Sequence, residues 1–336
     1  MTTLAPTPTR TPSDFAPLVA RVRAAGLLDR RRGHYAVSIA VNMLACAALC
    51  AGILLLGDSW WQLALAVLAA VLSVQSGFLG HDAGHQQIAR TRRVNRALGL
   101  LHADLLLGMS YGWWTNKHNR HHANPNHEDK DPDVSPGAFA WTRRQAAGRT
   151  GRTAQWLTRK QHLLFFPLLL LEGLNLKVGS WQTLPQRTRK DRWLESPLLV
   201  AHLVGYLALV FLSMPFAIGL TFVLVHQALF GLYLGSAFAP NHKGMPMPGP
   251  DDHWDHLHKQ VLTSRNVRGG VLTDWTLGAL NYQVEHHLFP SMPRPNLRRA
   301  QPIVRGYCTE MGLPYTETGL AESYAIGLRY LRDVGA

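Results

Sequence analysis

The chain has 336 residues, of which 47% are hydrophobic and 16% charged, and it carries a net charge of +13. Its mean hydropathy of −0.05 is that of a soluble protein, but the apolar residues are concentrated in blocks separated by basic stretches. This alternation indicates membrane spans with positively charged flanks. No nucleic-acid recognition motif accompanies the charge, so we expect no nucleic-acid partner. The three cysteines form no CxxC pair, which argues against a zinc ribbon or a thioredoxin-like site.

The first predicted element is a polar, basic segment over residues 1–33, which we expect to be partly disordered. It lacks the apolar region of a cleavable signal peptide. Residues 35–57 form an almost uncharged run that is long enough to cross a hydrocarbon core of ~30 Å as a helix. Residues 60–80 predict a second span, and its leading tryptophans suit a membrane interface. The two spans predict a helical hairpin.

The next region is polar and basic, with thirteen Lys or Arg residues between 86 and 160. Within it, the short apolar run 97–114 predicts an in-plane or partly inserted helix, and the interrupted run 162–178 an interfacial or re-entrant segment. Residues 196–213 and 215–239 predict the second hairpin of spans. The chain then becomes polar again. We assign residues 34–315 to one domain and residues 316–336 to a C-terminal tail.

Charge predicts the orientation of these spans. The two short connections, at 58–59 and 213–215, hold no Lys or Arg, whereas both terminal regions and the 86–160 stretch are basic. The positive-inside rule therefore places both termini in the cytoplasm, together with the polar stretches that follow the second and fourth spans. The predicted protein is all-α, with four transmembrane helices in the cytoplasmic membrane and a cytoplasmic helical cap.

Three histidine clusters lie just outside the apolar runs. They read HDAGH at 81–85, HNRHH at 118–122 and QVEHH at 283–287. Residues three or four apart share one face of a helix, and imidazole is a strong ligand for first-row metals. Seven imidazoles exceed the needs of one ion and predict a two-metal site. Neither HExxH nor Glu-x-x-His occurs, which argues against a zincin-like protease and a carboxylate di-iron bundle.

These motifs resemble the membrane fatty acid desaturases. Further matches are QVLTSRN at 260–266 and PRPNL at 293–297. A third cluster that begins with Gln is similar to the front-end, linoleoyl-CoA-desaturase-like branch, which includes actinobacterial acyl-CoA desaturases. Many front-end relatives carry a fused cytochrome b5 domain, but no HPGG-type haem loop is present. The resemblance therefore implies that electrons come from a separate protein, such as a ferredoxin or a flavoprotein reductase, drawn to the basic face.

The resemblance implies two non-haem iron ions that use O2 to remove two hydrogens from a long acyl chain. The implied ligands are His81, His85, His118, His121, His122, His286 and His287. His242 matches an additional ligand that usually follows the fourth span, and Asn241 beside it would orient a metal-bound water. Gln283 replaces a histidine, so it would coordinate, support a ligand or leave an open position.

Other polar residues near the clusters have two interpretations each. Asp131 and Asp133 would either orient ligand histidines or cap a helix. We expect Asp82 to support a ligand, and Asn266 either to line the site or to form a turn. The remaining histidines are expected to lie outside the site. His253, His256 and His258 are predicted at the surface, His202 and His226 as packed neutral residues in the spans, and His34, His102, His127 and His162 as interfacial or structural residues.

The motifs leave several alternatives open. A hydroxylase, an epoxidase or an acetylenase would use the same site, and the acyl carrier would be CoA, acyl-carrier protein or a membrane lipid. A metal transporter or a b-type haem protein would place its histidines inside the spans instead. Since the clusters lie outside them, the sequence favours the desaturase.

Overall fold

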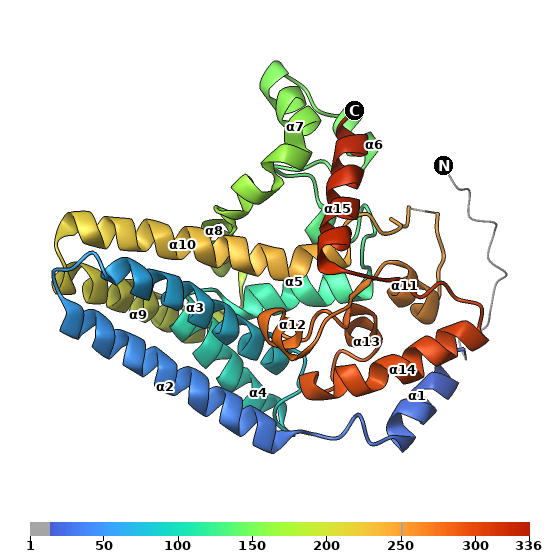
Figure 1. Cartoon of the computed structure of the whole chain (residues 1–336), viewed down its shortest axis with the longest axis horizontal. Helices are drawn as coiled ribbons and strands as arrows, with labels where there is room; N and C mark the ends of the chain where they lie inside the picture. The colour runs from blue at the N-terminus through green and yellow to red at the C-terminus, as the bar shows by residue number, and fades with distance from the viewer. Residues whose placement is uncertain (1–13, 250) are drawn as a thin grey trace.

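The computed structural model describes residues 14–249 and 251–336 and is almost entirely helical there. Four long helices are apolar enough to cross a membrane and pack against one another (Figure 1). They are α2 (Arg32–Leu56), α3 (Gln62–Gly84), α9 (Arg189–Ser213) and α10 (Phe216–Phe238). The prediction of four apolar helices is confirmed. The ends of α2, α3 and α10 lie within four residues of their predicted positions, because uninterrupted apolar runs of this length admit few other structures. Helix α9 ends where predicted but begins seven residues earlier, at Arg189.

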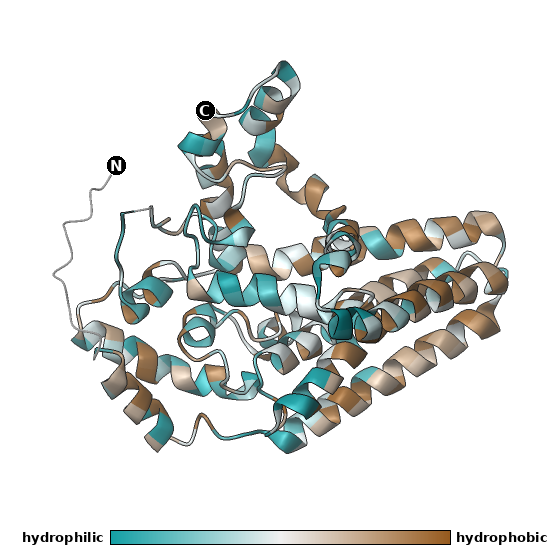
Figure 2. Ribbon diagram, turned by 180° about the vertical axis from the view of Figure 1, so that it is seen from behind, coloured by the Kyte–Doolittle hydropathy of each residue, from teal (hydrophilic) through white to brown (hydrophobic). Residues whose placement is uncertain are grey.

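The other elements surround one end of this bundle. They are α1 (Ala16–Ala24), α4 (Arg92–Gly99), η1 (Leu100–Leu107), α5 (Tyr111–Ala123), η2 (Pro132–Val134), α6 (Arg143–Ala147), α7 (Arg152–Leu169), α8 (Glu172–Thr183), η3 (Leu184–Gln186), η4 (Ala239–Asn241), α11 (His256–Leu262), β1 (Asn266–Val267), α12 (Val271–Thr276), α13 (Gln283–Leu288), α14 (Arg294–Glu310), β2 (Glu317–Thr318) and α15 (Leu320–Gly335). Figure 2 shows apolar residues dominating the bundle and polar residues gathering at this end.

The hydrophobic core has two main parts. In the bundle, side chains of α3 and α10 pack together around Phe78 and Phe230, and Leu277 and Leu280 from the C-terminal region join them. In the polar end, α1, α11, α13 and α14 share a second core. Because helix α3 runs from the first core to the start of the first histidine cluster, it fixes where that cluster lies.

Two local predictions differ from the structure, and the C-terminal tail, for which no structure was predicted, is folded. The all-α prediction misses a short parallel pairing of β1 with β2, in which Asn266 lies opposite Glu317. Part of the N-terminal segment expected to be disordered forms α1, whose Leu18 and Val22 are fully buried; residues 1–13 lie outside the described part. The C-terminal tail folds as β2 and α15, and α15 packs along α7. Each difference depends on contacts with distant segments, which local composition does not report.

The two ambiguous apolar runs are both helical. The run 97–114 contains the π-helix η1, which packs against α3 and α9. The run 162–178 forms parts of α7 and α8, which meet at a bend of 82° and are together apolar enough for a broken span or a re-entrant loop. The bend follows Pro167, which removes a backbone donor from the helix.

Helices α8 and α10 approach closely where glycines face each other. A Cβ at Gly231 would lie 2.6 Å from the Leu169 carbonyl oxygen and 2.7 Å from the Gly173 nitrogen. Gly231→Ala is therefore expected to destabilise the protein by about 1–3 kcal/mol through overpacking, measured as a lower unfolding temperature in detergent. Gly205→Ala in α9 is the control, because no atom of another described element lies within 4 Å of the added carbon. Equal unfolding temperatures for both variants would contradict this packing.

Candidate metal centre

The histidine clusters occupy the ends of three helices. His81 lies in the last turn of α3 and His85 caps that helix. His118, His121 and His122 lie in the last two turns of α5, and the third cluster forms the short α13. His242 follows η4 at the end of α10. The structure brings these eight histidines, which extend from residue 81 to residue 287 of the chain, into one cluster.

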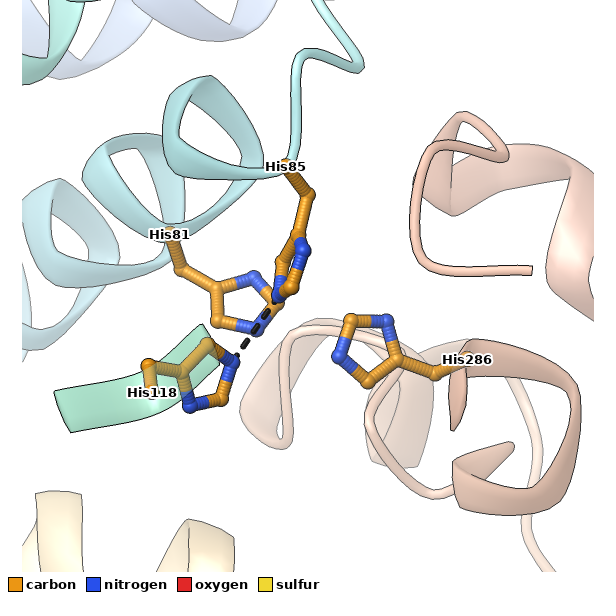
Figure 3. Close-up of side chains that lie close together, drawn as sticks. All are labelled: His81, His85, His118 and His286. Carbon is orange, nitrogen blue, oxygen red and sulfur yellow. Dashed lines mark hydrogen bonds between the residues drawn. The ribbon is translucent and has the colours of Figure 1, made fainter. Parts of the chain in front are cut away.

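Four of the histidines form a first set, namely His81, His85, His118 and His286. One ligand nitrogen from each lies within 4.8 Å of the others, and all four residues are buried. Figure 3 shows the rings converging, with His81 and His85 from α3, His118 from α5 and His286 from α13. The Nε2 atoms of His85 and His118 are 2.9 Å apart.

A second set consists of His121, His242 and His287. Their ligand nitrogens also lie within 4.8 Å of one another, and all three residues are buried. The Nε2 atoms of His242 and His287 are 3.1 Å apart. His121 also lies within the same distance of two carboxylates, those of Asp131 and Asp133. The second set thus combines histidines from α5, α13 and the segment after α10.

His122 lies between the two sets. Its Nε2 is 3.0 Å from that of His118 in the first set. Its ring stacks on that of His287 in the second set, with 4.2 Å between ring centroids. The two sets are therefore neighbouring parts of one site, and His122 is placed to contribute to either.

The hydrogen bonds of the second set leave nitrogen lone pairs facing each other. His242 Nδ1 donates to the Thr263 carbonyl oxygen, and His287 Nδ1 donates to the Gln260 side-chain oxygen, each at 2.9 Å. Gln260 is itself oriented, because its amide nitrogen donates to the His122 carbonyl oxygen. Both Nε2 atoms are then acceptors 3.1 Å apart. Two such atoms repel unless a cation lies between them, so this donor set fits a metal ion.

The first set has buried nitrogens without partners. His81 Nε2 and both ring nitrogens of His286 make no hydrogen bond within the described residues. A buried polar atom without a partner costs about 1–3 kcal/mol, and a metal ion would remove that cost. Imidazole nitrogens suit iron, copper, zinc and nickel, and neither cysteine nor methionine lies among them. This set therefore fits a borderline first-row metal as well.

Burial keeps most of these imidazoles in the neutral form that binds metals. It lowers the pKa values of His85, His118, His122, His286 and His287 well below their ordinary value, and neighbouring histidines add to the effect. The pKa of His242 falls to about 3, first because of burial and then because of His121. At His121 burial also lowers the pKa, but the charges of Asp131 and Asp133 outweigh it and raise the pKa above its ordinary value.

Asp131 has both of the roles predicted for it. Its Oδ2 accepts a hydrogen bond from His121 Nδ1 at 2.8 Å, which directs Nε2 of that ring toward the second set. Its Oδ1 accepts from the Asp133 nitrogen, and so caps η2. Asp133 lies 3.5 Å from His121 Nδ1 and pairs with Lys117. These carboxylates orient a candidate ligand and raise its basicity.

Asp82 connects the first set to α14. Its Oδ1 lies 3.2 Å from His81 Nδ1, and its Oδ2 forms an ion pair with Arg294 at 2.9 Å. The backbone nitrogen of Arg294 in turn donates to the Tyr35 hydroxyl and to Gln87. Arg294 belongs to the PRPNL motif, but its role was missed, because nothing local to the sequence places it beside Asp82.

The remaining candidates lie at the edge of the site or support it. Gln283 Nε2 is 2.9 Å from His242 Nε2, and Asn241 donates to Gln283 Oε1 at 3.3 Å. Asn266 does not belong to either histidine set. It accepts from the Val284 nitrogen and donates to Glu285, and so supports α13. Burial raises the pKa of Glu285 to about 7.

Most of the other histidines do not join the sets. His226 bonds to Ser73 and Tyr206 inside the bundle, and His202 to the Leu105 carbonyl oxygen. The prediction that His258 lies at the surface is wrong. It is buried in α11 and bonds to Asp255 at 2.6 Å, because α11 packs under α13.

Comparisons with known proteins identify the family whose members this chain resembles. Residues 58–319 match a family described as "Fatty acid desaturase". The chain is 30% identical to an "Acyl-lipid (9-3)-desaturase" of Physcomitrium patens, over 96% of this chain and 62% of that protein. It is 30% identical to "Delta(8)-fatty-acid desaturase 2" of Arabidopsis thaliana, over 95% and 74%, and 33% identical to "Fatty acid desaturase 3" of Bos taurus, over 78% and 59%.

The chain thus spans less than two thirds of the moss and bovine proteins. Its family match nevertheless extends from the start of α3 to β2 and includes all three histidine clusters and His242. The family match, the four apolar helices and the converging histidines are consistent with one another and with the motifs found in the sequence. This chain belongs to the fatty acid desaturase family.

Proposed function

We propose that this protein is an oxygen-dependent desaturase that inserts a double bond into a long fatty acyl chain. The observation that carries this proposal is the convergence of eight histidines at the end of an apolar helical bundle. Seven of them are buried and form two adjoining sets, and the half-buried His122 lies between the sets. Histidines inside the spans would favour a transporter or haem protein, but His202 and His226 there are already hydrogen-bonded. The relatives named delta-8 and (9-3) desaturases support placing the chain in the front-end branch.

Two iron ions would be held by the two sets, with His122 between them. They would supply the O2-dependent chemistry that an unactivated C–H bond requires. Loss of two hydrogens from the acyl chain, with two electrons and two protons from outside, reduces one O2 to two waters. The electrons would come from a separate donor such as a ferredoxin or a flavoprotein reductase. The acyl chain would carry CoA, acyl-carrier protein or a lipid headgroup.

The protein's own residues would position the ligands and exclude water. Asp131, Thr263 and Gln260 each accept a hydrogen bond from the Nδ1 of one histidine of the second set, so that Nε2 would face the metal. Asp82 lies against His81 in the same way. The apolar helices α3 and α10, which lead into the site, would exclude water from the reacting methylenes.

We further propose the topology predicted from the sequence. Helices α2 and α3 would form one transmembrane hairpin and α9 and α10 the other, with both termini and the helical cap in the cytoplasm. The residues at 30–32, which precede α2, and at 90–96, which follow α3, are rich in arginine, as is the segment 143–160 of the long connection between α3 and α9. This distribution supports the proposed orientation. Cysteines introduced at each terminus should react with a membrane-impermeant thiol reagent only after the cytoplasmic membrane is opened.

Product analysis tests the reaction. Membranes containing this chain, an iron supply, a reductase system and a long-chain acyl substrate should yield, only with O2, an acyl chain with two hydrogens fewer. Mass spectrometry of derivatised products would locate the double bond. A product that has gained one oxygen atom would instead identify a hydroxylase or an epoxidase. A product in which an existing double bond has become a triple bond would identify an acetylenase.

Gln283 is proposed as a positioning residue rather than a ligand. Its Oε1 accepts from Asn241, whose amide nitrogen is held by the Leu280 carbonyl oxygen at 3.0 Å. This hydrogen bond fixes the Gln283 side chain, whose amide nitrogen lies beside His242. Gln283→Ala should keep the wild-type iron content and lower the activity by about tenfold. A loss of iron equal to that of His242→Ala would show that Gln283 is a ligand.

A further inference from the structure

Helix α12 presents an apolar face that no other part of the described chain covers. Val271, Leu272 and Trp275 are 75%, 74% and 52% exposed. The one charged residue of this helix, Asp274, faces inward, accepts from Asn281 and lies 3.6 Å from Arg298. Three large apolar side chains exposed on one six-residue element are unusual for a region that is otherwise polar.

The position of α12 is fixed by hydrogen bonds to the spanning helices. Gln75 of α3 donates to the Trp275 carbonyl oxygen at 3.3 Å. Tyr233 of α10 donates to the Thr276 carbonyl oxygen at 2.8 Å. Immediately after α12, Gly278 has a φ of +60° and lies so close to α3 that a Cβ would meet the Phe78 ring at 2.6 Å. The C-terminal end of α12 is therefore held against α3 and α10.

The depth of Gln75 in the helical bundle follows from the position of its neighbour Ser76 beside α2. Ser76, next to Gln75, donates to Asn42 at 2.8 Å. Asn42 is seven residues into the apolar run that begins at residue 35, which is about 10 Å along a helix. Val41 and Leu44, beside Asn42, are 60% and 70% exposed. The residues that α12 contacts thus lie at the level of the apolar outer surface of the bundle.

We infer that α12 is a membrane-embedded element that inserts Val271, Leu272 and Trp275 into the acyl-chain edge of the bilayer. Its apolar side chains are exposed, and its backbone is bonded to two of the proposed spanning helices. Arg268 and Arg298, with side chains 59% and 54% exposed, flank it and suit anionic headgroup phosphates. This inference rests on the proposal that α2, α3 and α10 cross the membrane.

This insertion would set the height of the metal site above the bilayer. Six residues separate α12 from Gln283, and two of them, Leu277 and Leu280, are buried against α3 and α10. A short, packed connection transmits the position of α12 to α13, which carries His286 and His287. Membrane contact at α12 would therefore help to align the third histidine cluster with an acyl chain that enters from the bilayer.

Spin labels at single cysteines test the inference in the full-length protein. Cys46, Cys50 and Cys308 are first replaced by alanine, and the variant must keep its iron. Labels are then placed at Leu272→Cys, at Leu44→Cys as the span reference, and at Ala24→Cys, which is exposed on α1, as the aqueous reference. In vesicles with phosphatidylglycerol, the label at 272 should be relaxed by O2 and shielded from a water-soluble nickel chelate, as at 44.

Two outcomes at position 272 would overturn the inference. Relaxation by the nickel chelate, as at position 24, would place α12 in water. Protection from both O2 and nickel would show that protein covers it, either a partner or a second copy of the chain. If the label at position 44 also behaved like the label at position 24, the proposed spans themselves would be wrong. The label at 44 therefore distinguishes a failure of the proposed spans from a failure of the inference about α12.

Discussion

His286→Ala is expected to abolish product formation, with a loss of at least about a hundredfold in activity, and to lower the iron content. Both ring nitrogens of His286 are buried and have no hydrogen-bond partner among residues 14–249 and 251–336, and the ring lies among His81, His85 and His118. Alanine removes one of the four candidate ligand nitrogens of the first set. We expect the resulting loss of activity to be larger than the loss caused by replacing a supporting residue. Iron per chain and product per chain are measured on the purified protein.

His258→Ala is the matched control for this prediction. His258 is buried to a similar degree but bonds to Asp255 and lies in neither set. We expect this variant to keep its iron and most of its activity. Wild-type iron and product in His286→Ala would contradict the assignment of the first set.

Asp131→Asn should lower the activity or the iron affinity by about 10- to 100-fold while the protein stays folded. The substitution removes the negative charge that raises the pKa of His121 and holds its proton on Nδ1. Asparagine keeps an oxygen that can accept from the Asn126 nitrogen, which now bonds to Asp131 at 2.7 Å. The loss is measured by iron titration of the metal-free protein and by product formation.

Asp129→Asn provides the comparison for Asp131. Asp129 is two residues away, but it is exposed and pairs with Arg144 on the surface. Its replacement should leave iron affinity unchanged, because surface ion pairs of this kind contribute little. If Asp131→Asn bound iron as tightly as Asp129→Asn, the proposed orientation of His121 would be refuted.

The sequence predicted the spans and the histidine clusters, because both signals are local. An apolar run of about twenty residues has few structural outcomes, and histidines four apart on a helix face the same way. His242 is a single histidine with no local pattern, and only the resemblance to a family pointed to it. The structure places it beside His287.

The supporting residues could not be predicted in the same way. Arg294 lies beside Asp82, and Gln260 beside His287, only after segments far apart in the chain have packed together. The burial of His258 and the exposed face of α12 also arise from tertiary packing. Local composition placed both in a polar loop region, since neither shows the length or periodicity that identifies an element.

Metal analysis of the purified protein tests the central claim most directly. The two histidine sets predict two iron ions per chain, an optical spectrum without a Soret band, and a loss of iron in both His286→Ala and His242→Ala. One zinc ion per chain with no iron, or the spectrum of a bound haem, would contradict a di-iron desaturase.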